Sequence, residues 1–155
     1  MRALLALAGT LAALVATPAF SVGPVADCLV LGDHLAQNLG THLACDTQAK
    51  QNRTPSQALS SLRGPVLTPL TVLGFATLET SAQGLSELRA NLWGRVIWVA
   101  PTNSASVARN VAEDHEDVVI VRPEQFQRRG STLPTLEGYR WLARQVEKER
   151  DFSPH

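Results

Sequence analysis

The chain has 155 residues, which is enough for one domain with a buried core. It carries 14 Lys and Arg residues against 14 Asp and Glu residues, so its formal net charge is zero. This balance gives no support for electrostatic binding of nucleic acid or of an anionic membrane surface.

The first part of the chain differs in character from the rest. MRALLALAGTLAALVATPAF contains one Arg, an apolar run from Ala3 to Ala16, and small residues around Pro18. This order is typical of a secretory signal peptide, so we expect residues 1–19 to be removed and 20–26 to form a linker. The apolar run is short for a bilayer span, which needs roughly 20 residues, so no stable span is expected after cleavage. A retained anchor or a buried first helix is the alternative, and the predicted location is periplasmic or secreted.

The two cysteines, Cys28 and Cys45, both follow the predicted signal. An oxidising compartment favours a disulfide between them, and a pair of buried free thiols is the alternative. The sequence has no Cys-x-x-Cys pair and no His at ligand spacing for zinc. We therefore predict a disulfide, no metal and no cofactor.

After the signal, apolar strands alternate with helices of helical periodicity. Thr54 is expected to cap a helix that begins at Pro55, Asn103 or Ser104 to cap another, and Thr135 to cap the last one. The expected strands are 27–32, 45–50, 69–76, 95–100 and 117–121, and the expected helices are 35–43, 54–62, 81–92, one ending in the charged run 113–117, and one beginning at 135.

Strands that are apolar on both faces, each followed by a helix, predict a three-layer α/β/α sandwich with a five-stranded parallel sheet. We assign this domain to residues 27–150 and expect 151–155 to fray. In such sheets the functional site lies beyond the carboxyl ends of the strands. One rim is therefore expected to hold His34, the loop of Asn52, the 76–80 loop and the 128–133 segment.

Two stretches carry a family resemblance. LVLGDHLAQNLG resembles the first block of the SGNH, or GDSL, hydrolases, and LPTLEGYRWLA resembles their last block. The resemblance implies an SGNH-hydrolase-like, flavodoxin-like fold. It also implies a serine nucleophile, a histidine base with an aspartate three residues before it, and an oxyanion hole completed by a glycine N–H and an asparagine side chain.

Every functional position of that pattern is changed in this chain. The nucleophile position holds His34, the glycine position Asn52 and the asparagine position Ala76, while the aspartate and histidine positions fall on Gly130 and Leu133. Loss of nucleophile, base and acid together removes the mechanism. The resemblance therefore predicts a non-catalytic binding or accessory protein of the cell envelope.

The candidate ligand-binding residues are Asp33, His34, Arg128 and Arg129, because paired guanidinium groups suit a carboxylate or phosphate. The expected partner is a protein, a glycan or an acylated ligand. A nucleophilic or metal-bound His34 would need partners that the sequence does not place beside it. Two alternatives remain open: an active ester hydrolase of carbohydrate or lipid acyl esters with a nonstandard site, and a structural or assembly protein without a small ligand.

Two further features have a plain interpretation beside a functional one. Ser131 and Thr132 could supply a relocated hydroxyl, but no His neighbours them in sequence, so we interpret them as turn residues. Trp141 could stack on a sugar if it were exposed, although aromatic residues at such places mostly pack into a core.

Overall fold

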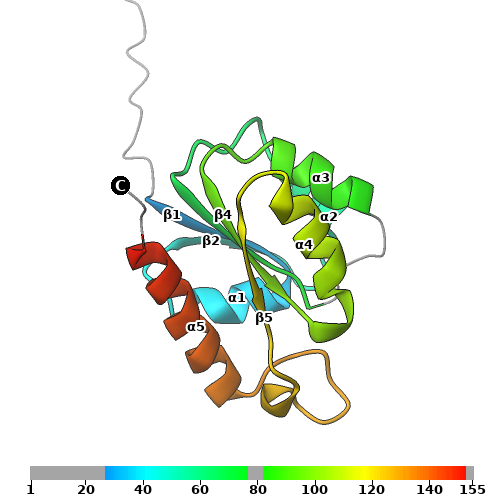
Figure 1. The fold of residues 1–155 in the computed structure, drawn as a ribbon, viewed down its shortest axis with the longest axis vertical. Helices are drawn as coiled ribbons and strands as arrows, with labels where there is room; N and C mark the ends of the chain where they lie inside the picture. The colour runs from blue at the N-terminus through cyan, green and yellow to red at the C-terminus, as the bar shows by residue number, and fades with distance from the viewer. Residues whose placement is uncertain (1–26, 77–81, 153–155) are drawn as a thin grey trace, which may run out of the picture.

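The computed structural model describes residues 27–76 and 82–152. The predicted signal peptide and linker, and residues 77–80 of the predicted rim, lie outside this part of the chain. The centre of the molecule is a five-stranded parallel sheet in the order β2-β1-β3-β4-β5 (Figure 1). Its strands are β1 (Cys28–Gly32), β2 (Asp46–Ala49), β3 (Leu70–Gly74), β4 (Arg95–Ala100) and β5 (Val118–Val121).

Helices cover both faces of the sheet, as the alternation of strands and helices predicts (Figure 1). Apolar residues of α1 and α5 form one core cluster with one face of the sheet, and residues of α2, α3 and α4 form a second cluster with the other face. The three-layer α/β/α fold is thus confirmed. The helices are α1 (His34–Gly40), α2 (Pro55–Ser61), α3 (Ala82–Ala90), α4 (Ala105–Glu113) and α5 (Leu136–Asp151), with 3-10 turns η1 (Thr102–Ser104) and η2 (Glu124–Phe126).

Strand burial explains why some strands are clearer in the sequence than others. Every residue of β1 and β3 is buried, which matches their continuous apolar runs. The edge strand β2 is instead mostly exposed and carries polar residues. An edge strand needs no apolar pattern on both faces, so its sequence signal is weak.

The predicted caps of α2 and α5 are confirmed. Thr54 and Gln57 form a reciprocal capping box before Pro55, and the Thr135 side chain accepts the N–H of Gly138 at 3.1 Å. Ser104 occupies the N-cap of α4, but its side chain makes no capping hydrogen bond, because η1 already leads the chain into that helix. The starts of helices α2 and α5 thus follow local side-chain signals, whereas the start of α4 does not.

The predicted end of the first helix is wrong by three residues. Helix α1 ends at Gly40 and does not continue to Leu43. The hydroxyl of Thr41 donates to the carbonyl of Asn38 at 2.8 Å, a local bond that competes with helix continuation. Helix α5 continues through Asp151, the first residue of the predicted frayed tail.

The predicted disulfide between Cys28 and Cys45 is present. It joins the first residue of β1 to the residue before β2 and so closes the loop that contains α1. A cross-link over 17 residues stabilises the fold by about 3 kcal/mol in the chain-entropy model.

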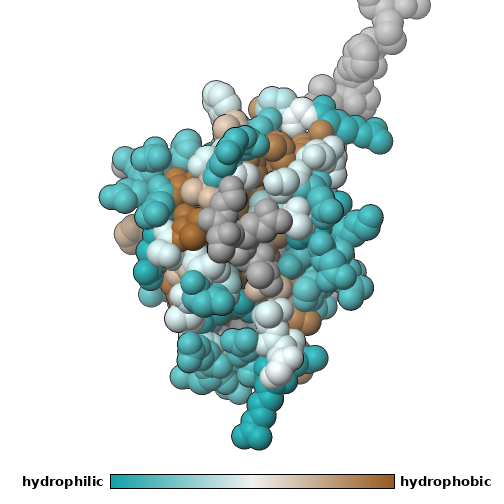
Figure 2. Space-filling model, turned by 90° about the vertical axis from the view of Figure 1, so that its right-hand side faces the viewer, coloured by the Kyte–Doolittle hydropathy of each residue, from teal (hydrophilic) through white to brown (hydrophobic). Residues whose placement is uncertain are grey.

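The surface on the side of α3 and α4 is mainly hydrophilic, with apolar side chains in small separate patches (Figure 2). The large apolar side chains exposed in the described residues are Leu67, Trp93, Leu136 and Phe152. Among the helices of residues 27–76 and 82–152, none is long and apolar enough to cross a membrane.

Candidate functional site

The carboxyl ends of β1 and β3 meet in the middle of the sheet, between connections that leave in opposite directions. Open parallel sheets bind ligands at such a switch point. Gly32 and Gly74 are paired there, and a Cβ on Gly32 would collide with the carbonyl oxygen of Gly74. The N–H of Asp33 donates to that same carbonyl at 3.1 Å. Glycine therefore allows the turn after β1 to lie directly against the end of β3.

The carboxylate of Asp33 holds this turn together. One oxygen, Oδ1, accepts the N–H of Leu35 at 2.7 Å and so caps α1, while Oδ2 accepts the N–H of Ala76 at 2.8 Å. The residue is buried, with 5% of its surface exposed. Asp33 is predicted from the sequence as a ligand-binding residue, but its carboxylate is already bound by two backbone N–H groups. In the structure, the Asp33 carboxylate therefore stabilises the turn after β1.

His34 is the first residue of α1 and lies at the switch point. Its side chain is 22% exposed, and its Nδ1 lies 3.8 Å from Oδ2 of Asp33, beyond hydrogen-bonding distance. Nδ1 is buried and has no hydrogen-bond partner among the described residues. The structure therefore places His34 where the resemblance puts a nucleophile, without a bonded partner to move a proton through Nδ1.

Arg122 is a residue of this site that the sequence interpretation missed. It follows β5 directly and is buried, with 7% of its surface exposed. Its Nη1 donates to the carbonyl of Thr132 at 2.6 Å and its Nη2 to the carbonyl of Ala76 at 3.2 Å. The available signal was a charged residue immediately after an apolar strand, at the carboxyl end where sites form.

Burial lowers the pKa of Arg122, because a guanidinium ion loses hydration in the interior. The charges of Tyr139 and Asp33 act in the opposite direction. The charge of Asp33 therefore acts on Arg122. The two hydrogen bonds of Arg122 connect the segment after β3 to the segment before α5.

The 127–134 segment forms a compact turn that contains two of the predicted positions. Gly130 has a left-handed φ of 69°, and a Cβ there would meet no atom within 4 Å. Leu133 is half-buried and packs against the core cluster of α1 and α5. A leucine side chain in an apolar core cannot accept a proton, and Gly130 has no side chain to orient one.

The hydroxyl of Ser131 also belongs to this turn. Its Oγ accepts the N–H of Leu133 at 3.1 Å, and its carbonyl accepts the side-chain amide of Gln127 at 2.7 Å. These bonds agree with the interpretation of Ser131 as a turn residue.

Asn52 lies in the turn between β2 and α2, is exposed, and has a φ of 58°. That turn is fastened to the switch point at its start, where the N–H of Lys50 donates to the carbonyl of Gly32 at 3.2 Å. Within the described residues, a hydrogen bond joins Asp33 to Ala76, His34 lies beside Asp33 without a bond to it, and Arg122 links Ala76 to Thr132, next to Leu133. No hydrogen bond joins Asn52 or Gly130 to the group.

Tyr139 adds a second buried polar group beside the site. Its hydroxyl accepts the side-chain amide of Asn38 at 3.3 Å, and its ring stacks on His42 with centroids 6.3 Å apart. Burial raises the pKa of the Tyr139 hydroxyl, and Asp33 raises it further, whereas the Asn38 bond and the charges of Arg122 and Arg128 lower it. The neutral phenol is therefore the favoured form in the folded chain.

Arg128 and Arg129 are both exposed on the 127–134 turn. Neither forms an ion pair within residues 27–76 and 82–152. Their guanidinium groups are accessible to a ligand. Hydration alone also satisfies exposed guanidinium groups, so this exposure does not by itself identify a binding site.

No family model, curated protein or solved structure matches this chain. The described residues contain no group of three or more His, Cys, Asp or Glu side chains that could hold a metal ion. The switch point offers a partly exposed imidazole and a turn held by backbone hydrogen bonds, and exposed guanidinium groups lie on the 127–134 turn.

Proposed function

We propose that this chain is an exported, SGNH-hydrolase-like protein that has lost the catalytic Ser, Asp and His and acts as a non-catalytic binding or accessory protein of the cell envelope. The sequence blocks around Asp33 and Pro134 and the three-layer fold support this proposal. The Cys28–Cys45 disulfide is consistent with a periplasmic or secreted location, because disulfides persist in oxidising compartments.

The environment of His34 is the observation that carries the proposal. The imidazole stands at the turn where the family has its nucleophile, and its buried Nδ1 has no partner in the described part of the chain. Leu133, at the base position, packs into the core. A hydrolytic mechanism of the family type needs a hydroxyl, a base and an acid in contact, and these positions supply none of them.

The oxyanion-hole position at Ala76 also offers no free hydrogen-bond donor. Ala76 has no side-chain donor, and its backbone N–H is already donated to Asp33 at 2.8 Å. A donor that is already bound is not free to stabilise a developing oxyanion. The rim can still bind a ligand through the exposed part of His34 and the guanidinium groups of Arg128 and Arg129, which suit a protein, a glycan or an acylated ligand with acceptor oxygens.

Hydrolysis of p-nitrophenyl acetate by the purified protein tests the loss of catalysis. We expect the same rate for the natural protein and for His34→Ala, both close to the rate of buffer with an inert protein. A turnover well above that of His34→Ala would defeat the proposal and favour the alternative of an ester hydrolase with a nonstandard site.

A restorative variant tests the family assignment itself. His34→Ser, Gly130→Asp and Leu133→His together rebuild the three lost groups at the assigned positions, with His34→Ser and Gly130→Asp alone as the matched control. We expect weak esterase activity in the triple variant only, kept low by Ala76. A folded triple variant no faster than its control would contradict the assignment of the final block.

Thermal-shift measurements with glycans and peptidoglycan fragments separate a ligand-binding protein from an assembly protein. A ligand that binds the native state raises the apparent melting temperature in proportion to the logarithm of its concentration. We expect such a rise for at least one class, reduced in Arg128→Ala with Arg129→Ala. The absence of any rise would favour the structural or assembly alternative.

A further inference from the structure

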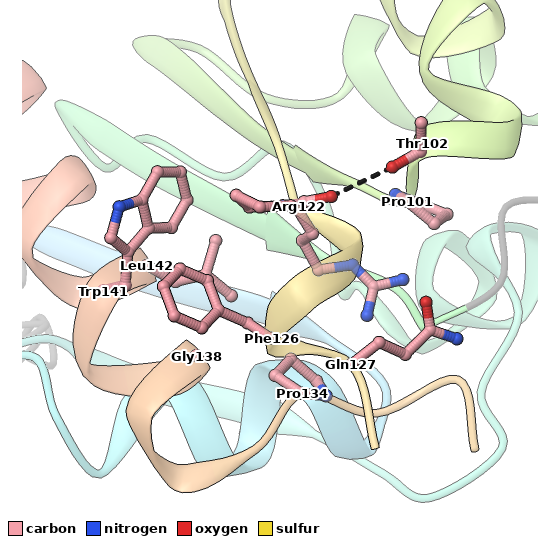
Figure 3. Close-up of a pocket in the computed structure, with 10 residues that line it drawn as sticks. Pro101, Thr102, Arg122, Phe126, Gln127, Pro134, Gly138, Trp141 and Leu142 are labelled. Carbon is pink, nitrogen blue, oxygen red and sulfur yellow. Dashed lines mark hydrogen bonds between the residues drawn. The ribbon is translucent and has the colours of Figure 1, made fainter. Parts of the chain in front are cut away.

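A pocket that shares Arg122 with the site around His34, but does not include His34, lies between β5, η2 and the first turns of α5 (Figure 3). In Figure 3 the rings of Phe126 and Trp141 lie on one side, and the Arg122 guanidinium and the Gln127 amide lie on the other. The ring centroids of Phe126 and Trp141 are 5.8 Å apart, and Leu142 completes the apolar wall. The pocket thus has an apolar side and a polar side, as small-molecule sites commonly do.

The polar side presents one unused donor. Nη1 and Nη2 of Arg122 donate to the carbonyls of Thr132 and Ala76, but Nε is buried and has no acceptor among the described residues. Only 7% of the Arg122 surface is exposed. Buried donors are bonded in the great majority of cases, so an acceptor oxygen is expected at this nitrogen.

The charge of Arg122 also lacks a direct partner. The ion pairs of the described residues do not include Arg122, and both carboxylate oxygens of Asp33, whose charge acts on Arg122, are bound to backbone N–H groups. The lowering of the Arg122 pKa by burial agrees with a cation that is incompletely compensated. A buried cation of this kind favours an anionic acceptor over a neutral one.

We propose that this pocket binds a small carboxylate with a short apolar body. A carboxylate oxygen accepts the N–H of Arg122 Nε, and the apolar body lies against Phe126 and Trp141. The enclosed part of the pocket has room for little more than one water-sized sphere, so one carboxylate oxygen occupies it and the rest of the ligand lies toward the surface. This inference is independent of the loss of hydrolysis, because the pocket does not use His34.

Proton–nitrogen NMR correlation spectra of the full protein test this site with butyrate as the probe and butanol as its uncharged counterpart. We expect butyrate to shift the Arg122 Nε–H and Trp141 indole N–H signals in a saturable way. The dissociation constant is expected in the millimolar range, because a ligand of so few atoms gains little contact. Butanol is expected to bind at least about tenfold more weakly, since it cannot pair with the guanidinium.

Trp141→Ala removes part of the apolar wall and is expected to weaken butyrate binding by about tenfold. The matched control is Trp93→Ala, because Trp93 is 75% exposed and lies just before β4, at the opposite end of the sheet from the pocket. In the natural protein, intermolecular NOEs between the butyrate methyl group and the rings of Phe126 and Trp141 would test the same binding site without a variant. Unchanged Arg122 and Trp141 signals, equal binding of butanol, or equal weakening by both tryptophan variants would each overturn the proposal.

Discussion

Asp33 and Arg122 bind the two backbone groups of one residue without forming an ion pair with each other. Oδ2 of Asp33 accepts the N–H of Ala76 at 2.8 Å, and Nη2 of Arg122 donates to the carbonyl of Ala76 at 3.2 Å. Both side chains are at least nine-tenths buried. The chain leaving β3 is therefore held from both sides by opposite charges, and the switch point is a structural junction as well as a candidate site.

Asp33→Asn should destabilise the fold by about 1 to 3 kcal/mol, because one amide oxygen cannot accept both N–H groups that the carboxylate accepts. Urea unfolding followed by tryptophan fluorescence measures the change. Asp46→Asn is the control, since Asp46 is exposed on the edge strand and its loss should change stability by no more than about 0.5 kcal/mol. Equal unfolding midpoints for the two variants would show that the two bonds of Asp33 contribute little.

Arg122→Met should lower the free energy of unfolding by about 2 to 3 kcal/mol, because it leaves the carbonyl of Ala76 buried without its donor. Arg122→Lys should recover only part of this loss, since an ammonium group does not reproduce the two donors of the guanidinium fork. The control is Arg129→Met on the exposed turn, with an expected change within about 0.5 kcal/mol. Equal free energies of unfolding for Arg122→Met and Arg129→Met would refute the stabilising role of the Arg122 hydrogen bonds.

Reduction of the Cys28–Cys45 disulfide should cost about 3 kcal/mol of stability by releasing the loop that holds α1. Guanidinium unfolding with and without dithiothreitol measures the difference. The double variant Cys28→Ala with Cys45→Ala should have the same unfolding midpoint as the reduced protein, and dithiothreitol should not change it. A midpoint that does not move on complete reduction would contradict the expected contribution.

Stability at alkaline pH should report on Tyr139. Burial raises the folded-state pKa of its hydroxyl above the ordinary value of 10.0, so the folded chain keeps a proton that the unfolded chain releases. The stabilisation is complete below about pH 10 and is lost as pH rises through the folded pKa. Tyr139→Phe should remove this loss, so the difference in stability between the two proteins should change only above that pH.

The ionisation itself can be measured directly because Tyr139 is the single tyrosine of the chain. Phenolate absorbance should titrate at higher pH in the folded protein than in the denatured protein. Coincident titrations would mean that the hydroxyl is hydrated in the folded state.

Much of the fold could be predicted because its signals are local. Apolar runs at β1, β3 and β4 report burial on both faces, and Thr54 and Thr135 announce helix starts through bonds to residues three positions away. The disulfide followed from two cysteines after a predicted export signal. The C-terminal end of α1 and the start of α4 without a side-chain cap could not be predicted, because neighbouring turns compete with the helix for the same backbone groups.

The site itself depends on contacts between distant residues. By sequence alone Arg122 resembles Arg129, a cation in a connecting segment, yet one binds a carbonyl 46 residues away and the other is exposed. The Asn38 amide likewise meets the Tyr139 hydroxyl across 101 residues. The sequence by itself determined the order of strands and helices, the covalent staple and the position of His34, because periodicity, caps and cysteines act through near neighbours. Only the tertiary structure decided which polar groups around His34 are already bound and which remain free, because a long side chain finds its acceptor only when the folded sheet brings remote backbone within its reach.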